Sequence, residues 1–569
     1  MNIPFWLYNC QGIYFTQALK VVLWRTIYFS DKVLENPCEY NNHEKVFSMM
    51  HSVKSPCDEG VIRAAPGHAA PHEAGLWVLI ATILGSSMAF IDGSVVNVAL
   101  PALQQTLNAS SANVQWVVEA YALFLSALIL VGGSLGDHFG RRRIFALGIA
   151  LFALASMWCG LAPTIEQLIL ARAVQGIGGA LLVPGSLAII SASFSDERRG
   201  QAIGTWSGFT SVTSVLGPVL GGWLVQYASW RWVFFINVPL AAVVLVVLFW
   251  RVPESRDENA SGKLDWLGAL LATVSLAGIV AGLIESSSLG LLHPVVLGAL
   301  AVGIVALLLF LLVEARIAHP MMPFTLFRSS TFSGANLLTF LLYGALSAAT
   351  YFIPFNLIQV QGYSPAAAGA SLVPFALTMF LLSRWTGGLV KRVGAKIPLV
   401  IGPSITTVGF ILFAVPTIGG SYWTTFFPAV IVMSIGMAIT VAPLTTTVMN
   451  AVAQHYAGTA SGINNAISRT AGLIAIAALG IVIAQVFQSN LAQHLSLLHL
   501  PAALQQMVEA QSGKLAGIDI SQGGHAQIQL KQAIDQSFVA GFRVVVLICA
   551  GLSLASALAA GLMIEGKKK

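Results

Sequence analysis

Long apolar segments recur along most of the chain, and they constrain its fold more than any other feature. The first is GLWVLIATILGSSMAFIDGSVVNVAL, from Gly75 to Leu100, and about twenty apolar residues suffice for a helix to cross a bilayer. Fourteen such segments lie at residues 75–100, 113–135, 143–162, 165–190, 202–226, 231–250, 265–285, 293–315, 333–359, 365–386, 397–417, 424–448, 459–486 and 538–564. Only 9% of residues are charged, against roughly 25% in soluble domains. The sequence therefore predicts an all-α integral membrane protein.

Lysine and arginine residues in the short connections predict the orientation. If the N-terminus lies inside, the outer connections contain only Arg231, Lys514 and Lys531. The inner ones contain Arg141, Arg142, Arg143, Arg198, Arg199, Arg251, Arg256, Lys263, Arg316, Arg328, Lys391, Arg392 and Lys396. Short cytoplasmic loops carry such an excess of basic residues. We therefore expect fourteen spans with both termini inside. Because the basic residues are mostly in these inner connections, the net charge of +6 does not indicate nucleic-acid binding.

A weak internal repeat suggests how the spans are grouped. GSLGDHFGRRR (Gly133–Arg143) follows the second span and GGLVKRVGAKI (Gly387–Ile397) follows the tenth, and in-register copies are typical of transporters built from repeats. The predicted parts are an N-terminal six-helix bundle (75–250), a two-helix insert with linkers (251–332), a C-terminal six-helix bundle (333–565) and a basic tail (566–569). The C-terminal bundle includes a long outer loop, 487–537, which is interpreted as a structural cap or a docking site for a partner.

Residues 1–74 are an N-terminal extension of a different character. The stretch is rich in aromatic residues but has no clean apolar core or cleavage site of a signal peptide. Our hypothesis is that residues 1–48 derive from a start codon assigned too early, and a cytoplasmic tail is the alternative. The five cysteines of the chain have no metal-type spacing, so no metal site is expected.

Three charged residues lie inside the predicted spans. Asp92 precedes the outer end of the first span by nine residues, Glu119 follows the start of the second by about six, and Arg172 follows the start of the fourth by about nine. At 1.5 Å per residue, all three lie about 9–14 Å below the outer surface. Two acids and one arginine leave one excess carboxyl group where a proton can bind. The alternative is an ion pair that only locks helices together.

Five stretches together carry a family resemblance: IDGSVVNVALP, GSLGDHFGRRR, ARAVQGIGGALLVPGS, SVLGPVLGG and SWRWVFFINVPL. In this combination the chain resembles the fourteen-span drug:proton antiporters of the major facilitator superfamily, of the bacterial multidrug and methylenomycin-resistance type. The resemblance is detailed from Gly75 to Pro239 and extends to the C-terminus in layout. It implies the major facilitator fold, with two six-helix bundles and two inserted helices.

The resemblance also implies roles for individual residues. It assigns proton coupling to Asp92, Glu119 and Arg172, and an inner-loop gate to Gly133, Asp137, Gly140, Arg141 and Arg142. It assigns the antiporter motif of the fifth span to Gly217, Pro218, Gly221 and Gly222, where ordinary helix packing is a compatible interpretation. Candidate residues of a substrate cavity are Asn97, Gln175, Tyr351, Phe355, Asn464 and Arg469. The aromatic members suit flat apolar compounds but are equally ordinary core residues.

The expected function is a proton-driven exporter of small amphipathic compounds in the bacterial plasma (inner) membrane. Its energy source is the proton gradient, no cofactor is expected, and its partners are the drug-like substrate, protons and membrane lipid. A periplasmic adaptor is a further candidate partner. One alternative is an exporter of a single metabolite or self-made antibiotic. A membrane enzyme acting on lipids is a remote alternative, because we find no cluster of catalytic residues or metal ligands.

Overall fold

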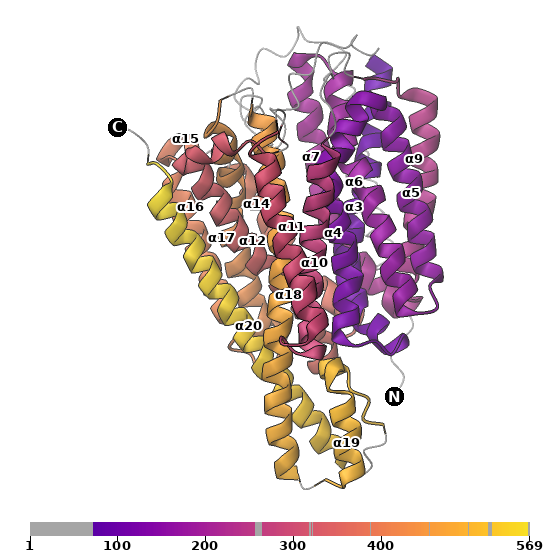
Figure 1. Cartoon of the computed structure of the whole chain (residues 1–569), viewed down its shortest axis with the longest axis vertical. Coiled ribbons are helices and arrows are strands. Elements are labelled where there is room, and N and C mark those ends of the chain that lie inside the picture. The colour runs from indigo at the N-terminus through magenta and orange to yellow at the C-terminus, as the bar shows by residue number, and fades with distance from the viewer. Residues whose placement is uncertain are drawn as a thin grey trace, which may run out of the picture. The chain divides into compact units, whose positions relative to one another are not determined.

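The described part of the chain is an all-helical membrane protein. The computed structural model describes residues 72–256, 265–317, 320, 322–386, 389–453, 456–498, 500–521 and 526–566, all of which belong to the unit Ser55–Lys569 (Figure 1). These residues form helices and no strands, which confirms the predicted fold class. The extension up to residue 71, with its hypothetical false start, and the tail 567–569 lie outside the described residues.

The N-terminal group of helices contains the first six predicted spans. It consists of α3 (His72–Thr106), α4 (Ser111–Phe139), α5 (Arg141–Leu161), α6 (Ile165–Ser193), α7 (Asp196–Tyr227), α8 (Trp232–Phe235) and α9 (Asn237–Arg251). Glycines let these helices pack closely: a side chain at Gly132 of α4 would overlap the backbone of Ala180 in α6. Gly178 of α6 lies in the same way against Phe152 of α5. Close backbone approach therefore fixes α6 between α4 and α5.

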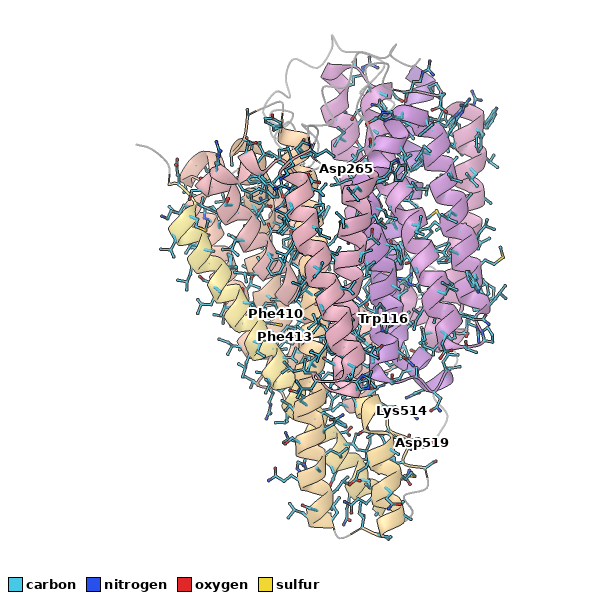
Figure 2. All side chains as sticks on the ribbon, viewed as in Figure 1. Trp116, Asp265, Phe410, Phe413, Lys514 and Asp519 are labelled. Atoms are coloured by element: carbon cyan, nitrogen blue, oxygen red, sulfur yellow. The ribbon has the colours of Figure 1, made fainter. Side chains whose placement is uncertain are left out.

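The C-terminal group contains the last six predicted spans. It consists of η3 (Phe324–Arg328), α12 (Ser330–Phe355), the π-helical turn η4 (Asn356–Val360), α13 (Pro365–Ala370), α14 (Val373–Thr386), α15 (Leu389–Val393), α16 (Lys396–Phe413), α17 (Tyr422–Asn450), α18 (Ala457–Leu498), α19 (Ala502–Ala510), η6 (Ser512–Gly517) and α20 (Gln527–Met563). α12 packs against α18 and α20, and α16 packs against α17 and α20. Phe410 and Phe413 of α16 are buried in this group (Figure 2).

Two inserted helices, α10 (Trp266–Leu289) and α11 (Pro294–Glu314), lie between these groups in the chain and in space (Figure 1). α10 packs against α4 of the N-terminal group and α18 of the C-terminal group. The indole of Trp116 in α4 donates a hydrogen bond to Glu285 of α10 at 3.1 Å. The most apolar 18-residue stretch of α11 has a mean hydropathy of 3.1, and only 17% of this stretch is buried within the protein. α11 therefore exposes most of its surface to lipid.

Each of the fourteen apolar segments falls on helix in the structure. Thirteen helices among the described residues are long and apolar enough to cross a membrane. The fifth segment corresponds to α7, which is 32 residues long but rich in glycine, serine and threonine, and it is not among the thirteen. The count of fourteen spans and the inside location of both termini stay predictions.

The described helices alternate in direction, so their connections gather at two ends. The end that carries Arg141, Arg251 and Lys396 is called the basic end here, and the end that carries α19 is called the hairpin end (Figure 1). Asp265 lies at the basic end, and Lys514 and Asp519 lie at the hairpin end (Figure 2). Under the predicted orientation, the basic end faces the cytoplasm.

The segment expected as a long outer loop, residues 487–537, is largely helical. α18 continues to Leu498, α19 and η6 follow, and α20 begins at Gln527. Leu491 and Leu495, whose helical spacing is visible in the sequence, are buried. η6 contacts α3 and α4 as well as α18 and α20. η6 thus contacts helices of both groups, and the structural-cap and docking-site interpretations both stay predictions.

Candidate functional site: a buried ion pair and a lone carboxyl group

Asp92 and Arg172 meet inside the N-terminal group. Asp92 of α3 is fully buried, Arg172 of α6 is 1% exposed, and Oδ2 of Asp92 accepts a hydrogen bond from Nη1 of Arg172 at 2.5 Å. Neither charge would be stable alone at this depth, because an isolated ion in the membrane interior is costly. The ion pair with Arg172 therefore explains how α3 can contain an aspartate within its apolar segment.

Amide side chains complete the hydrogen bonding of this pair. Gln175, one turn after Arg172, donates from Nε2 to Asp92 Oδ1 at 2.8 Å and accepts from Arg172 Nη1 at 2.7 Å. Asn237 of α9 donates to Asp92 Oδ1 at 3.3 Å and to Ser156 Oγ of α5 at 3.0 Å. Buried ionic groups are stable only when their remaining donors and acceptors are satisfied. Asp92 is thus held by side chains from two neighbouring helices, α6 and α9.

Arg172 is also fixed from the side of α4. Its Nε donates to the backbone carbonyl of Val117 at 3.0 Å. The centre of its guanidinium lies 4.3 Å from the ring centroid of Tyr121, which is a cation–π distance. These contacts hold the guanidinium between α3 and α4, so that one side chain connects three helices of the N-terminal group.

Glu119 of α4 is the second embedded acid, and its surroundings differ from those of Asp92. Its side chain is fully buried, and neither carboxyl oxygen has a hydrogen-bond partner in the described part of the chain. Tyr351 of α12, in the C-terminal group, lies within electrostatic range of this carboxyl group. Glu119 therefore has an aromatic residue of the opposite group of helices within electrostatic range.

The structure brings only two of the three expected charged residues into direct contact. Asp92 pairs with Arg172, whereas Glu119 forms no ion pair with Arg172. Counting residues from the span ends predicted that the three residues lie at a similar depth. Which side chains face each other depends, in addition, on the rotation of each helix about its axis. The excess carboxyl group inferred from the sequence is accordingly Glu119.

The residues expected at the inner-loop gate lie together at the basic end. Arg141 pairs with Asp137 one turn earlier, at 2.8 Å. Arg142 donates its backbone N–H to Glu254 Oε1 at 3.0 Å and its Nη1 to the carbonyl of Val252 at 3.0 Å. Gly140 has φ of +107°, a conformation that L side chains rarely adopt. A side chain at Gly133 would lie 3.5 Å from Pro184 of α6, in ordinary van der Waals contact.

The antiporter-motif residues of α7 lie where that helix touches α3 and the C-terminal group. A side chain at Gly217 would overlap Ser94 Oγ of α3, and one at Gly221 would lie 2.6 Å from Val95 of the same helix. At the hairpin end, a side chain at Gly222 would overlap the carbonyl oxygen of Pro365, and one at Gly369 would overlap that of Pro218. The motif thus packs α7 against α3 and also brings it against α13.

The candidate cavity residues fall into different environments. Gln175 is fully buried in the network of Asp92 and Arg172. Asn464 binds Asn336 and Thr339, which joins α18 to α12. Arg469 of α18 is partly exposed and lies within electrostatic range of Tyr121 in α4.

The remaining candidates lie closer to the meeting of the two groups. Oδ1 of Asn97 in α3 is buried without a hydrogen-bond partner among the described residues. The rings of Tyr351 and Phe355 are tilted by 43° with their centroids 5.6 Å apart, and both residues line a small pocket at the hairpin end. Among the candidate cavity residues, Asn97 is therefore the one with a buried polar atom that has no hydrogen-bond partner in the described part of the chain.

Sequence reasoning did not single out two residues of these clusters. Asn237 supports Asp92, and Glu254 binds the first turn of α5 through Arg142 and lies 3.6 Å from Arg143. The sequence could have indicated Asn237 as a site residue, because it is the one amide side chain within the apolar stretch VFFINVPL. Glu254 follows the sixth span directly, but its place in a short charged connection gives no indication of its partner.

Comparison with known proteins identifies the family. Residues 82–477 match the model of the Major Facilitator Superfamily. The chain is 35% identical over 430 residues to the Multidrug resistance protein Stp of Mycobacterium tuberculosis, covering 74% of this chain and 78% of that protein. It is 35% identical to the Methylenomycin A resistance protein of Bacillus subtilis, covering 72% and 88%. It is 31% identical to the Tetracenomycin C resistance and export protein of Streptomyces glaucescens, covering 84% and 90%.

A solved structure supports the same fold. A bacterial homolog of the human lysosomal transporter Spinster, in its inward-facing and occupied conformation, superimposes with a TM-score of 0.61 at 18% identity, covering 86% of this chain and 98% of that one. At this identity the similarity concerns the fold alone. Together with the family match over most of the chain, it leads to one conclusion. The chain is a member of the Major Facilitator Superfamily, and hence a multi-pass membrane transporter and not an enzyme.

Proposed function

We propose that this protein exports small amphipathic, drug-like compounds across the bacterial plasma membrane in exchange for protons. Its relatives carry the names of multidrug, methylenomycin A and tetracenomycin C resistance proteins, which supports an exported substrate of drug-like chemistry. The observation that carries proton exchange is the carboxyl group of Glu119, which is buried with neither oxygen hydrogen-bonded in the described part of the chain.

The surroundings of Glu119 suit a group that binds and releases a proton. A charged carboxylate buried without a partner costs several kcal/mol, and a bound proton removes that charge. When water from the basic end reaches the same group, hydration stabilises its charged form and the proton leaves. Asp92, in contrast, already has Arg172, Gln175 and Asn237 as partners, so its charge is compensated in the buried state. Glu119 is therefore the proposed proton carrier, and Asp92 with Arg172 orients α3 and α6.

We infer that substrate and protons are exchanged by alternating access, in which the central site opens to one side of the membrane at a time. In this proposal the N-terminal group (α3–α9) and the C-terminal group (α12–α20) rock against each other around a central substrate site. In the present conformation the groups touch at the hairpin end, where Gln359 donates to Gln104 Oε1 at 2.9 Å and Ala366 N donates to Gln226 Oε1 at 3.3 Å. Separation of these contacts opens the central site to the outside. There the substrate leaves and Glu119 takes up a proton, which it releases at the basic end.

A narrower substrate range is the second candidate. Two of the relatives are named for resistance to a single antibiotic, methylenomycin A or tetracenomycin C. In this variant the same proton exchange drives the export of one metabolite. A screen of chemically varied compounds distinguishes the two candidates, because a broad exporter moves several unrelated cations or neutral drugs.

Ethidium efflux tests the proposal in bacteria that lack their own multidrug pumps. Cells with the wild-type protein should extrude ethidium, an uncoupler should abolish the extrusion, and Glu119→Gln should abolish it at equal protein level. Leu292, which is 86% exposed, provides a control position, because Leu292→Met should leave efflux unchanged. Uncoupler-insensitive efflux, or full efflux by Glu119→Gln, would refute proton exchange through this residue.

A further inference from the structure

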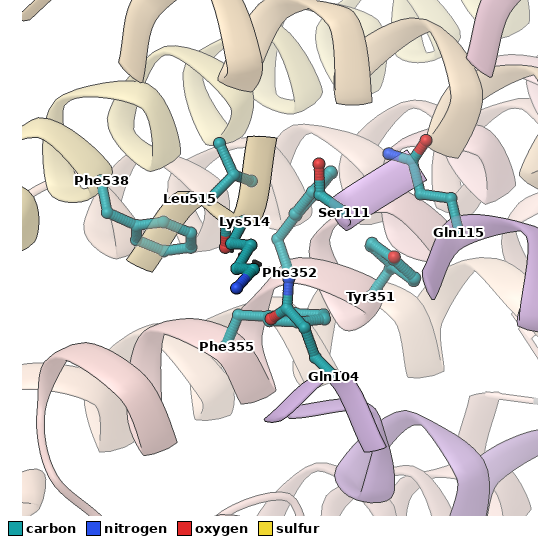
Figure 3. Close-up of a pocket in the computed structure, with 9 residues that line it drawn as sticks. All are labelled: Gln104, Ser111, Gln115, Tyr351, Phe352, Phe355, Lys514, Leu515 and Phe538. Carbon is teal, nitrogen blue, oxygen red and sulfur yellow. Dashed lines mark hydrogen bonds between the residues drawn. The ribbon is translucent and has the colours of Figure 1, made fainter. Parts of the chain in front are cut away.

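A small pocket lies between the two groups of helices at the hairpin end. Figure 3 shows its lining residues, which are Gln104, Ser111, Gln115, Tyr351, Phe352, Phe355, Lys514, Leu515 and Phe538. They come from α3 and α4 of the N-terminal group and from α12, η6 and α20 of the C-terminal group. The pocket has room for about one water molecule. It is therefore too small for a drug and of the right size for a proton-carrying water.

One polar residue of the pocket, Gln115, lacks a partner that a water would provide. Gln115 is 3% exposed, and its Oε1 has no hydrogen-bond partner in the described part of the chain. An unsatisfied buried amide oxygen costs about 1–3 kcal/mol, and ordered water is the usual remedy. Ser111 and Tyr351, which both carry a hydroxyl group, line the same pocket. Gln104, in contrast, is already bound to Gln359 and to the backbone of Lys514.

Glu119 lies one turn of α4 beyond Gln115, which lines the pocket. Gln115 and Glu119 are four residues apart on α4, so their side chains lie on the same face of that helix. Tyr351, which lines the same pocket from α12, is within electrostatic range of the Glu119 carboxyl group. Gln115 thus lies one helical turn from the lone carboxyl group, and Tyr351 lies within its electrostatic range from the opposite group of helices.

We propose that this pocket holds a water molecule between Gln115 and Tyr351, and that protons reach Glu119 from the hairpin end through it. The inference rests on the proposed function and specifies the route of its proton. The water accepts a proton from the outer solvent and passes one to the Glu119 carboxylate, so that no other reactant is consumed. Gln115 orients the water by accepting a hydrogen bond through Oε1, and the Tyr351 hydroxyl binds it from the other side.

η6 covers this route in the present conformation. Nζ of Lys514 donates to Asn108 Oδ1 at 2.5 Å, and Gln104 Nε2 donates to the carbonyl of Lys514 at 3.1 Å. These bonds hold η6 on α3 and on the connection to α4, where Leu515 lines the pocket. When the two groups separate at the hairpin end, η6 leaves the pocket and outer water reaches Gln115. The route is therefore open only in the conformation that should load the proton.

Two measurements, proton flux and substrate exchange, distinguish a role of Gln115 and Tyr351 in this proton route from a purely structural role of these residues. The full-length protein is placed in liposomes that contain a pH-sensitive dye, and an ethidium gradient drives proton movement. Ethidium–ethidium exchange at equal pH is measured in parallel, because it needs no net proton transfer. The variants are Gln115→Leu, which keeps most of the side-chain volume, and Tyr351→Phe, which keeps the ring. Gln105→Leu is the control, since Gln105 is an exposed glutamine one residue from Gln104.

The proposal predicts a split between the two measurements. Gln115→Leu and Tyr351→Phe should lower ethidium-driven proton flux by about tenfold or more, as expected when a proton-transferring water loses a hydrogen-bond partner. Gln115→Leu should exchange ethidium at close to the wild-type rate, and Gln105→Leu should match the wild type in both assays. Equal loss of flux and exchange in Gln115→Leu, or unchanged flux in both variants, overturns the route while the wild type still couples. A wild type without ethidium-driven proton flux overturns the proposed function and this inference together.

Discussion

Nη1 of Arg172 lies 2.5 Å from Oδ2 of Asp92, in a region of the N-terminal group where both side chains are buried. The pair has no net charge, and Gln175 and Asn237 bind the remaining oxygen of the aspartate. Glu119, on the neighbouring helix α4, has no comparable partner in the described residues. The two embedded acids therefore differ in kind: one belongs to a closed network, and the other has no hydrogen-bond partner among the described residues.

Removal of Arg172 alone should destabilise the protein strongly. Arg172→Ala leaves the buried carboxylate of Asp92 without its ion-pair partner, and breaking a buried pair in this way costs about 3–5 kcal/mol. The unfolding temperature of the detergent-solubilised protein should fall accordingly. The double variant Asp92→Asn with Arg172→Gln removes both charges and should recover much of the stability. If the single variant is as stable as the wild type, the ion pair has no structural role.

Gly222 should control closure at the hairpin end. In Gly222→Val the new side chain would overlap the carbonyl oxygen of Pro365, so α7 and α13 cannot keep their present distance. A cysteine introduced by Gln104→Cys should then react faster with a membrane-impermeant maleimide added outside. Gly551→Ala is the matched control, because a side chain there meets no atom within 4 Å. Equal labelling in all three proteins would contradict a closing role for this contact.

A tether across the hairpin end should stop transport. Gln104 of α3 and Gln359 of η4 bind each other through their side-chain amides at 2.9 Å in the present conformation. A Gln104→Cys, Gln359→Cys protein treated with a short reducible bifunctional thiol reagent should lose ethidium efflux and regain it after reduction. Each single cysteine variant should be unaffected by the same treatment. Continued efflux by the tethered protein would show that these groups do not separate during the cycle.

Gly140 should be important for the connection at the basic end. Gly140→Ala places a side chain on a backbone with φ of +107° and 2.9 Å from the carboxyl group of Glu254. A side chain in such a sparsely populated conformation costs about 1–3 kcal/mol. Thermal unfolding should report this loss, and Gly298→Ala, which meets no atom within 4 Å, should not. A stable Gly140→Ala protein would mean that the turn rearranges freely.

The helices could be located from the sequence because the bilayer imposes a strong signal. A span needs about twenty apolar residues, and every predicted segment falls on helix. The hairpin end gave no such signal, because α19 and η6, at 9 and 6 residues, are too short to span a bilayer. The spacing of Leu491, Leu495 and Leu498 indicated a helix, but it did not show that this helix is the continuation of α18.

The candidate site was predictable in depth but not in rotation about the helix axes. Counting residues from the span ends brought Asp92, Glu119 and Arg172 to one level, and two of them do meet. The sequence could not show that Gln175 faces Asp92, or that Asn237 reaches it from α9, because both depend on how α3, α6 and α9 are turned. The proximity of Tyr351 to Glu119 depends in turn on how the two groups of helices meet.

Substrate-driven proton flux in liposomes tests the central claim most directly, with wild type, Glu119→Gln and Glu119→Asp compared at equal protein density. The wild type should take up protons as ethidium moves down its gradient. Glu119→Gln should show none, because a neutral amide cannot carry a proton, and Glu119→Asp should retain part of the flux because it keeps the carboxyl group. Undiminished proton flux by Glu119→Gln would contradict the account, since the proton would then travel on another residue.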